Sequence, residues 1–174
     1  MSILRESLSD SIRHDRSLGV LTNESDVPKR GMSYLQGETT QPLSYITIPQ
    51  LLRETVARFG PRDAVIFGQS KKRYSYYDLD RDVDALASGF LALGLDKGDR
   101  VGIWAPNRYE WVLTQFASAR VGLVMVNINP AYRLSEVEYV LKKVRCKSLI
   151  LANKFKSSNY IEMIQQLVPE LESC

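Results

Sequence analysis

The residue types best suited to contacting a ligand lie together in one short segment. They are Asn129, Pro130, Ala131, Tyr132 and Arg133. Amide, phenol and guanidinium groups hydrogen-bond to carbonyl or phosphate oxygens, and a tyrosine ring offers a flat face for stacking. Asn107 stands in a similar setting, within the segment Pro-Asn-Arg-Tyr-Glu at 106–110. These residues are the candidate ligand contacts of the sequence.

Each candidate also has a purely structural interpretation. Asn107 could cap a helix, and Pro130 could simply end a strand. Tyr132 could pack beneath the following helix while Arg133 is solvated. The residue types alone leave both interpretations open. Trp104 and Trp111, in contrast, are expected in the core rather than at a cofactor.

The remaining inventory excludes several classes of catalytic site. The chain has a single histidine, His14, and two cysteines, Cys146 and Cys174, so a Ser–His–Asp triad, a metal cluster and a disulfide framework are not expected. The ten glycines form neither a Walker A pattern nor a GxGxxG fingerprint. We therefore assign no catalytic residue and no metal ligand to this chain.

The elements that must position the candidates follow from hydrophobic periodicity. Short apolar runs without alternation occupy 101–105, 124–128 and 148–152, as in parallel strands buried on both faces. Helical stripes lie between the runs, and Ser135 with Glu138 forms a capping box for the second of these helices. Alternating strands and helices predict an α/β fold with a doubly wound, largely parallel sheet flanked by helices.

The strand order along the chain decides which loops can meet a ligand. Ligands of such sheets bind beyond the carboxyl ends of the strands. The segments 106–110 and 129–133 follow strands directly, as does 153–157. The segment 94–100 has two glycines, a lysine and an arginine, but it leads into a strand. It is predicted to be a helix-to-strand turn at the opposite edge.

Further elements precede the sheet. Thr47 and Gln50 form a capping box for a helix that ends at Gly60, and Ser75 with Asp78 opens a longer helix that ends at Gly94. Between these helices two short strands are predicted at 63–67 and 72–75. A last helix is predicted after the sheet, at about 158–168. The expected organisation is an N-terminal extension at 1–45 followed by one domain at 46–174.

Composition sets limits on partners and location. A net charge of +3 and short basic clusters that are not interleaved with aromatic residues do not indicate nucleic-acid binding. No apolar run has the length of a transmembrane segment. Glu6, Asp10 and Asp15 interrupt the N-terminal segment, which disfavours a transit peptide. A cytoplasmic location is predicted, with the mitochondrial matrix as the alternative.

Two long segments carry a family resemblance. RYSYYDLDRDVDALASGFLALGLDKGDRVGIWAPNRYEWVLTQFASARVGLVMVNINPAY resembles the first core motifs of the acyl-adenylate-forming (AMP-binding) enzymes, and LSEVEYVLKKVRCKSLILANKFKSSNYIEMI continues the match. The stretches SYLQGETTQPLSYIT and NPAYRLSEVEYVLKKVRCKSLI are most similar to medium-chain fatty acyl-CoA synthetases and bacterial fatty-acyl-CoA synthetases. The likeness covers about residues 33–172.

The resemblance implies a two-step ligase. A fatty acid reacts with ATP, assisted by Mg²⁺, to give an acyl-adenylate and pyrophosphate, and the thiol of coenzyme A then displaces AMP. In related enzymes the loop that matches 129–133 lies near bound coenzyme A, so Arg133 could meet a phosphate and Tyr132 could line the approach of the thiol. A medium-chain acid is the implied substrate.

The family's phosphate- and magnesium-binding motifs do not occur in these 174 residues. The chain is therefore expected to be an incomplete N-terminal subdomain of the fold that binds neither ATP, Mg²⁺ nor coenzyme A by itself and has no activity alone. The alternatives are a stand-alone flavodoxin-like binding module and a regulatory paralogue without catalysis.

Overall fold

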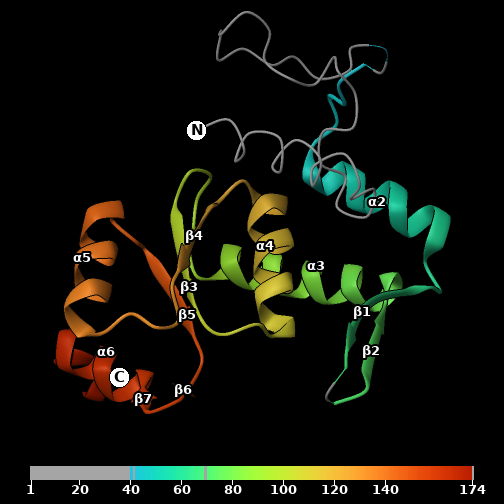
Figure 1. Cartoon of the computed structure of the whole chain (residues 1–174). Coiled ribbons are helices and arrows are strands. Elements are labelled where there is room, and N and C mark those ends of the chain that lie inside the picture. Colours follow the sequence, from blue (N-terminus) through green and yellow to red (C-terminus); the bar gives the residue numbers. More distant parts are fainter. Residues whose placement is uncertain (1–39, 41, 69, 174) are drawn as a thin grey trace, which may run out of the picture. The chain divides into compact units, whose positions relative to one another are not determined.

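The computed structural model describes residues 40, 42–68 and 70–173. The chain separates into two units between Tyr45 and Ile46, and all the elements below belong to the second unit. Nearly all of the extension predicted at 1–45, including His14, lies outside the described residues. The elements run in the order α2 (Ile48–Phe59), β1 (Asp63–Phe67), β2 (Lys72–Ser75), α3 (Tyr76–Ala92), β3 (Arg100–Trp104), α4 (Tyr109–Val121), β4 (Val124–Ile128), α5 (Leu134–Val144), β5 (Ser148–Leu151), β6 (Lys154–Phe155), β7 (Ser158–Asn159), α6 (Tyr160–Leu167) and the 3₁₀ helix η2 (Pro169–Ser173) (Figure 1).

The central sheet has the order β4-β3-β5, and both pairings are parallel. This confirms the predicted parallel strands. Only β3 is buried on both faces, however, whereas Val124 at the start of β4 is 49% exposed and β5 is half-buried throughout. The prediction of full burial is wrong for β4 and β5 because, among the described residues, each is hydrogen-bonded on one side only.

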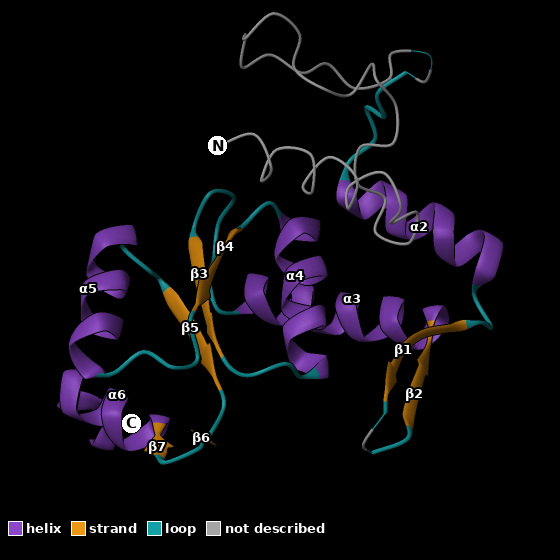
Figure 2. Ribbon diagram, viewed as in Figure 1, coloured by secondary structure: helices purple, strands orange, loops and turns teal. Residues whose placement is uncertain are grey.

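Helices cover both faces of this sheet (Figure 2). The chain passes from β3 through α4 to β4, then crosses back through α5 to β5 on the other side of β3. One hydrophobic cluster joins α2, α3 and α4 to Val101 of β3. A second cluster joins α5 and α6 to Trp104 of β3. The predicted doubly wound arrangement is thus confirmed, with α4 and α5 on opposite faces.

The capping patterns of α2 and α3 form as predicted. Asp78 N–H donates to Ser75 Oγ at 3.1 Å, and Ser75 N–H donates back to Asp78 Oδ2 at 3.0 Å. The Thr47 and Gln50 pair does the same at α2. Gly94 follows α3 at φ +73°, a conformation that costs glycine little, so it ends the helix as expected. Between the two helices β1 and β2 form an antiparallel hairpin.

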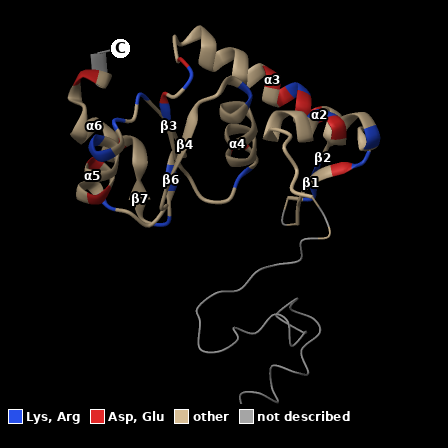
Figure 3. Ribbon diagram, turned by 90° about the horizontal axis from the view of Figure 1, so that it is seen from above, with Lys and Arg blue, Asp and Glu red and all other residues tan. Residues whose placement is uncertain are grey.

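A polar seam joins α3 to α4. Acidic residues recur along α3, with one arginine among them (Figure 3). The Arg120 guanidinium of α4 contacts Asp80 at 2.6 Å and also contacts Asp84, while only 15% of the Arg120 side chain is exposed. The fully buried Thr114 hydroxyl donates to the Glu110 carbonyl of its own helix. The buried hydroxyl thus has a hydrogen-bond partner within α4. The predicted apolar stripe of this helix did not include Thr114.

The glycine- and lysine-containing segment 94–100 lies at the amino edge of the sheet, as predicted. Asp99 pairs there with Lys147 at 2.7 Å. Arg100 Nε–H donates to the Val144 carbonyl at 2.9 Å, so these charges join the starts of neighbouring strands. Within the described part of the chain, no helix is long and apolar enough to cross a membrane.

Candidate functional site

The loop 129–133 emerges at the carboxyl edge of the sheet, between β4 and α5, where the sequence predicted it. It is internally ordered. Ala131 N–H donates to Asn129 Oδ1 at 2.9 Å, and Tyr132 N–H donates to the Asn129 carbonyl at 3.0 Å. The Asn129 amide oxygen is thus used within the loop, and this side chain shapes the turn that presents Tyr132 and Arg133.

The cap that joins this loop to α5 differs from the predicted one. Arg133 N–H donates to Glu136 Oε2 at 2.7 Å, and the helix begins at Leu134. The predicted box of Ser135 and Glu138 is therefore wrong, and Glu138 instead pairs with Lys142 at 2.6 Å. The glutamate at 136 also lies three residues after an extended residue, so spacing alone could not distinguish the two positions.

Arg133 combines exposure with partial orientation. The residue is exposed, and its Nη1–H donates to Ser158 Oγ of β7 at 3.0 Å. A planar guanidinium has further donors besides the one used here, and such donors can meet a phosphate oxygen. Tyr132 is half-buried and packs against the cluster beneath α5. Arg133 thus presents an exposed guanidinium, and Tyr132 is partly structural.

Two aromatic side chains hold the loop from below. Trp104 and Tyr160 are wholly buried, and their rings stack at 3.7 Å between centroids and 12° between planes. Trp104 Nε1–H donates to the Asn129 carbonyl at 3.1 Å, and the Tyr160 hydroxyl donates to the Pro130 carbonyl. Burial raises the pKa of Tyr160, so its hydroxyl remains a protonated donor. The expected core position of Trp104 is confirmed.

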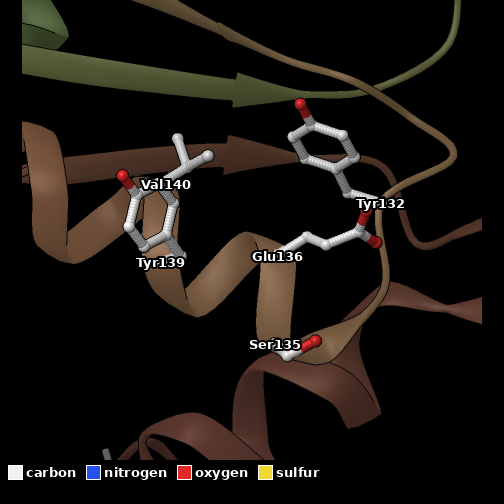
Figure 4. A pocket seen from close by; sticks show the side chains of 5 residues that line it. All are labelled: Tyr132, Ser135, Glu136, Tyr139 and Val140. Atoms are coloured by element: carbon white, nitrogen blue, oxygen red, sulfur yellow. The ribbon is translucent and has the colours of Figure 1, made fainter.

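A cavity of about 300 Å³ adjoins the loop at Tyr132. It is lined by Tyr132, Ser135, Glu136, Tyr139 and Val140. The two tyrosine rings flank this space, with Glu136 between them along α5 (Figure 4). This volume is at the lower end of the range for small-molecule sites. The space has aromatic side chains on two sides, and no candidate from 106–110 lines it.

A larger cavity of about 550 Å³ lies where β3 and β5 end. Its polar lining residues are Arg108, Glu110, Asn153 and Lys154. The chain leaves β3 toward α4 on one face and leaves β5 toward α6 on the other. Such a divergence of neighbouring strands forms the crevice in which ligands of doubly wound sheets bind.

These four residues were not among the site candidates, although all lie in 106–110 and 153–157, segments that the sequence predicted at the carboxyl edge. The two segments line one cavity because β5 lies next to β3. Hydrophobic periodicity does not reveal which strands are neighbours in the sheet. The Arg108 guanidinium contacts Glu110 at 3.1 Å, and this hydrogen bond holds the pKa of the Glu110 carboxyl below its ordinary value. Asn107 is exposed and does not line this cavity, and α4 begins after Arg108 without a side-chain cap. The capping alternative for Asn107 is therefore wrong.

The ring in the segment 106–110 serves the scaffold. Tyr109 stacks on Tyr74 of β2 at 3.7 Å between centroids and 8° between planes. Its hydroxyl donates to Asp82 Oδ2 of α3 at 3.0 Å, and burial together with this carboxylate raises its pKa. Tyr109 therefore ties β2, α3 and α4 together and is not available to stack on a ligand.

The carboxyl edge offers donors but no metal site. Among the described residues, no group of three or more His, Cys, Asp or Glu side chains could hold an ion. The carboxylates nearest this edge are engaged, Glu110 by Arg108 and Glu136 by the Arg133 amide. The described residues at this edge therefore do not fit a magnesium site. The arrangement can orient a polar or anionic ligand, and it contains no paired nucleophile and base.

Comparison with known proteins places this edge in a family context. A family model described as "AMP-binding enzyme" matches residues 52–173. A curated relative from Danio rerio, named "Medium-chain acyl-CoA ligase ACSF2, mitochondrial", is 44% identical over 151 residues, which cover 87% of this chain and 25% of that protein. The human protein of the same name is 42% identical over 176 residues, covering 97% of this chain and 29% of its own length. The chain thus spans about a quarter of the length of the relatives it matches.

Solved structures show the same fold. The N-terminal domain of FACL13 from Mycobacterium tuberculosis, bound to an inhibitor, superposes with a TM-score of 0.63 at 25% identity over 70% of this chain and 29% of that one. The anthranilate CoA ligase AuaEII superposes with a TM-score of 0.64 at 21% identity over 75% of this chain and 24% of that one, a likeness of fold alone.

Proposed function

Because the chain belongs to the AMP-binding enzyme family, we propose that it is the N-terminal part of an ATP-dependent acyl-CoA synthetase. The proposed reaction joins a fatty acid to coenzyme A. The carboxylate attacks ATP to give an acyl-adenylate and pyrophosphate, and the coenzyme A thiol then attacks the acyl carbonyl and releases AMP. A medium-chain fatty acid is the proposed substrate.

One observation carries this proposal. Relatives named as medium-chain acyl-CoA ligases are 42–44% identical to the chain over 87–97% of its length. The matched stretch covers most of the chain rather than one motif. The names of these relatives include the word mitochondrial, which favours the mitochondrial alternative over the predicted cytoplasmic location.

We assign this chain the role of one wall of the active site. ATP and Mg²⁺ would be held by groups outside these residues, because the carboxylates at this edge are engaged and no Walker A pattern occurs. When bound, Mg²⁺ would neutralise charge that develops on the phosphates. The 174 residues alone are therefore proposed to be inactive.

The loop 129–133 is the proposed contact for coenzyme A. Arg133 would donate to a phosphate through the guanidinium N–H groups that are not bonded to Ser158. Tyr132, in the wall of the smaller cavity, would line the approach of the thiol. Asn129, Pro130 and Ala131 would shape the turn, with the Asn129 side chain accepting the Ala131 amide. Asn107, exposed on the neighbouring loop, is the most peripheral of the proposed contacts.

Two assays of the purified full-length protein test the reaction. Octanoate should support ATP–pyrophosphate exchange and, with coenzyme A, formation of the thioester at a higher kcat/KM than hexadecanoate. The 174-residue polypeptide should give no exchange above a heat-killed control.

Absence of acid-dependent exchange in the full-length protein with either acid would overturn the synthetase proposal and favour a binding module. Exchange by the 174 residues alone would refute the proposed inactivity. A preference for hexadecanoate would refute the medium-chain assignment while leaving the reaction class intact.

A further inference from the structure

The stacked Trp104 and Tyr160 rings bring two donors to consecutive carbonyl groups of one loop. The indole N–H meets the Asn129 carbonyl at 3.1 Å, and the phenol meets the Pro130 carbonyl. Both rings are wholly buried, so neither can touch a ligand on the surface. Fixing two successive carbonyls fixes the peptide planes from which Ala131 to Arg133 continue. The buried pair thus determines the direction in which the exposed end of the loop projects.

The residues just before α6 contact the loop 129–133 at a second point. Ser158, two residues before Tyr160, accepts the hydrogen bond from Arg133 Nη1 at 3.0 Å. The Tyr160 backbone N–H donates to the Asn153 carbonyl at 3.0 Å, and Asn153 lines the larger cavity. The segment 158–160 therefore touches the loops that follow β4 and β5, and it holds both the Arg133 side chain and the Pro130 carbonyl.

We propose that Trp104 and Tyr160 are positioning residues for coenzyme A, holding the loop 129–133 in the arrangement that binds it. This inference rests on the proposed function of that loop. Tyr160 is the more informative of the two, because removing its hydroxyl deletes one hydrogen bond and leaves the stacked rings in place. The pair acts on the second half-reaction, and adenylate formation does not depend on it.

The chain contains a closely matched control. Tyr109 also stacks on an aromatic ring at 3.7 Å, and its hydroxyl also makes one hydrogen bond, to Asp82 at 3.0 Å. Tyr160→Phe and Tyr109→Phe therefore remove the same atom from a stacked, hydrogen-bonded ring, which is wholly buried at Tyr160 and half-buried at Tyr109. They differ in what the hydroxyl holds, which is a loop carbonyl in one case and a carboxylate of α3 in the other.

The experiment compares these variants in the full-length protein, with Trp104→Phe as a second change that removes the indole donor. Hydrogen exchange measured by mass spectrometry on peptides spanning 126–134 reports whether the loop is held. In Tyr160→Phe, exchange there and the KM for coenzyme A should each rise about three- to tenfold, as expected for one lost hydrogen bond. The kcat of ATP–pyrophosphate exchange should stay at the wild-type value. Tyr109→Phe should change none of these three quantities.

Each other outcome counts against the inference. Unchanged loop exchange in both Tyr160→Phe and Trp104→Phe would show that the pair does not hold the loop. Faster loop exchange without a change in the KM for coenzyme A would show that holding the loop does not serve binding. Arg133→Ala then separates the causes. If it raises that KM, only the positioning role fails, and if it does not, the proposed site of coenzyme A fails as well.

Discussion

Two loops leave the carboxyl edge of the sheet on opposite faces, and each is anchored by a stacked aromatic pair. In the segment 106–110 the anchoring ring, Tyr109, belongs to the segment itself, as the first residue of α4, and its hydroxyl donates to Asp82. In 129–133 the anchoring rings, Trp104 and Tyr160, come from outside the loop. The second loop therefore keeps its own aromatic ring, that of Tyr132, at the wall of a cavity.

This difference separates scaffold from candidate site. A ring that ties three elements together cannot also move to stack on a ligand. A loop that is held through its carbonyl groups can present its side chains and still be well positioned. The polar seam of Arg120, Asp80 and Asp84 lies on the same side as the Tyr74–Tyr109 pair, and it too joins helices rather than a loop.

The largest effect is expected from removing the indole that supports 129–133. Trp104→Ala in the full-length protein should lower the free energy of unfolding by about 3–5 kcal/mol, because a wholly buried ring leaves a cavity. It should also speed hydrogen exchange in 129–133. Tyr74→Ala, which removes the half-buried partner in the other pair, should cost less and leave exchange in 129–133 unchanged. Urea unfolding and exchange by mass spectrometry measure both effects, and an equal response of the loop to both variants would contradict the comparison.

A smaller loss of stability is expected from the helix seam. Arg120→Met removes a guanidinium that bridges Asp80 and Asp84, at an expected cost of about 2 kcal/mol because the contacts are charge-assisted and partly shielded from water. Arg81→Met is the control, since the Arg81 side chain is 68% exposed and its ion pairs are screened, so its loss should be much smaller. Unfolding in urea gives the two costs. The KM for coenzyme A should be unchanged in both variants, and a rise in Arg120→Met would place this seam in the site.

Most of the fold could be predicted from local patterns. Capping boxes at Thr47 and Ser75 and the apolar runs of β3, β4 and β5 are short-range signals, and each element formed where the pattern placed it. The capping box predicted at Ser135 is wrong because the helix begins at Leu134. Glu136 therefore caps the Arg133 N–H, although Glu138 has the same spacing from Ser135.

The site was less accessible to sequence reasoning. The position of 129–133 at the carboxyl edge followed from strand order along the chain, whereas the cavity beside Arg108 and Lys154 depends on β5 lying next to β3. The support of the loop by Tyr160 joins residues 30 positions apart, and no periodicity reports such a contact. Long-range pairing is thus the part of the site that required the structure.

The most direct test of the central claim is the effect of Arg133→Ala on the two half-reactions of the full-length protein, measured separately. Arg53→Ala, an exposed arginine on α2, controls for the loss of one positive charge. Arg133→Ala should lower kcat/KM for coenzyme A by the equivalent of about 1.5–3 kcal/mol, because one charge-assisted contact to a phosphate is lost. Its acid-dependent pyrophosphate exchange should stay at the wild-type rate. Arg53→Ala should leave both half-reactions at wild-type values. If Arg133→Ala leaves both half-reactions and the apparent affinity for coenzyme A unchanged, the loop 129–133 is scaffold and the proposed site is wrong.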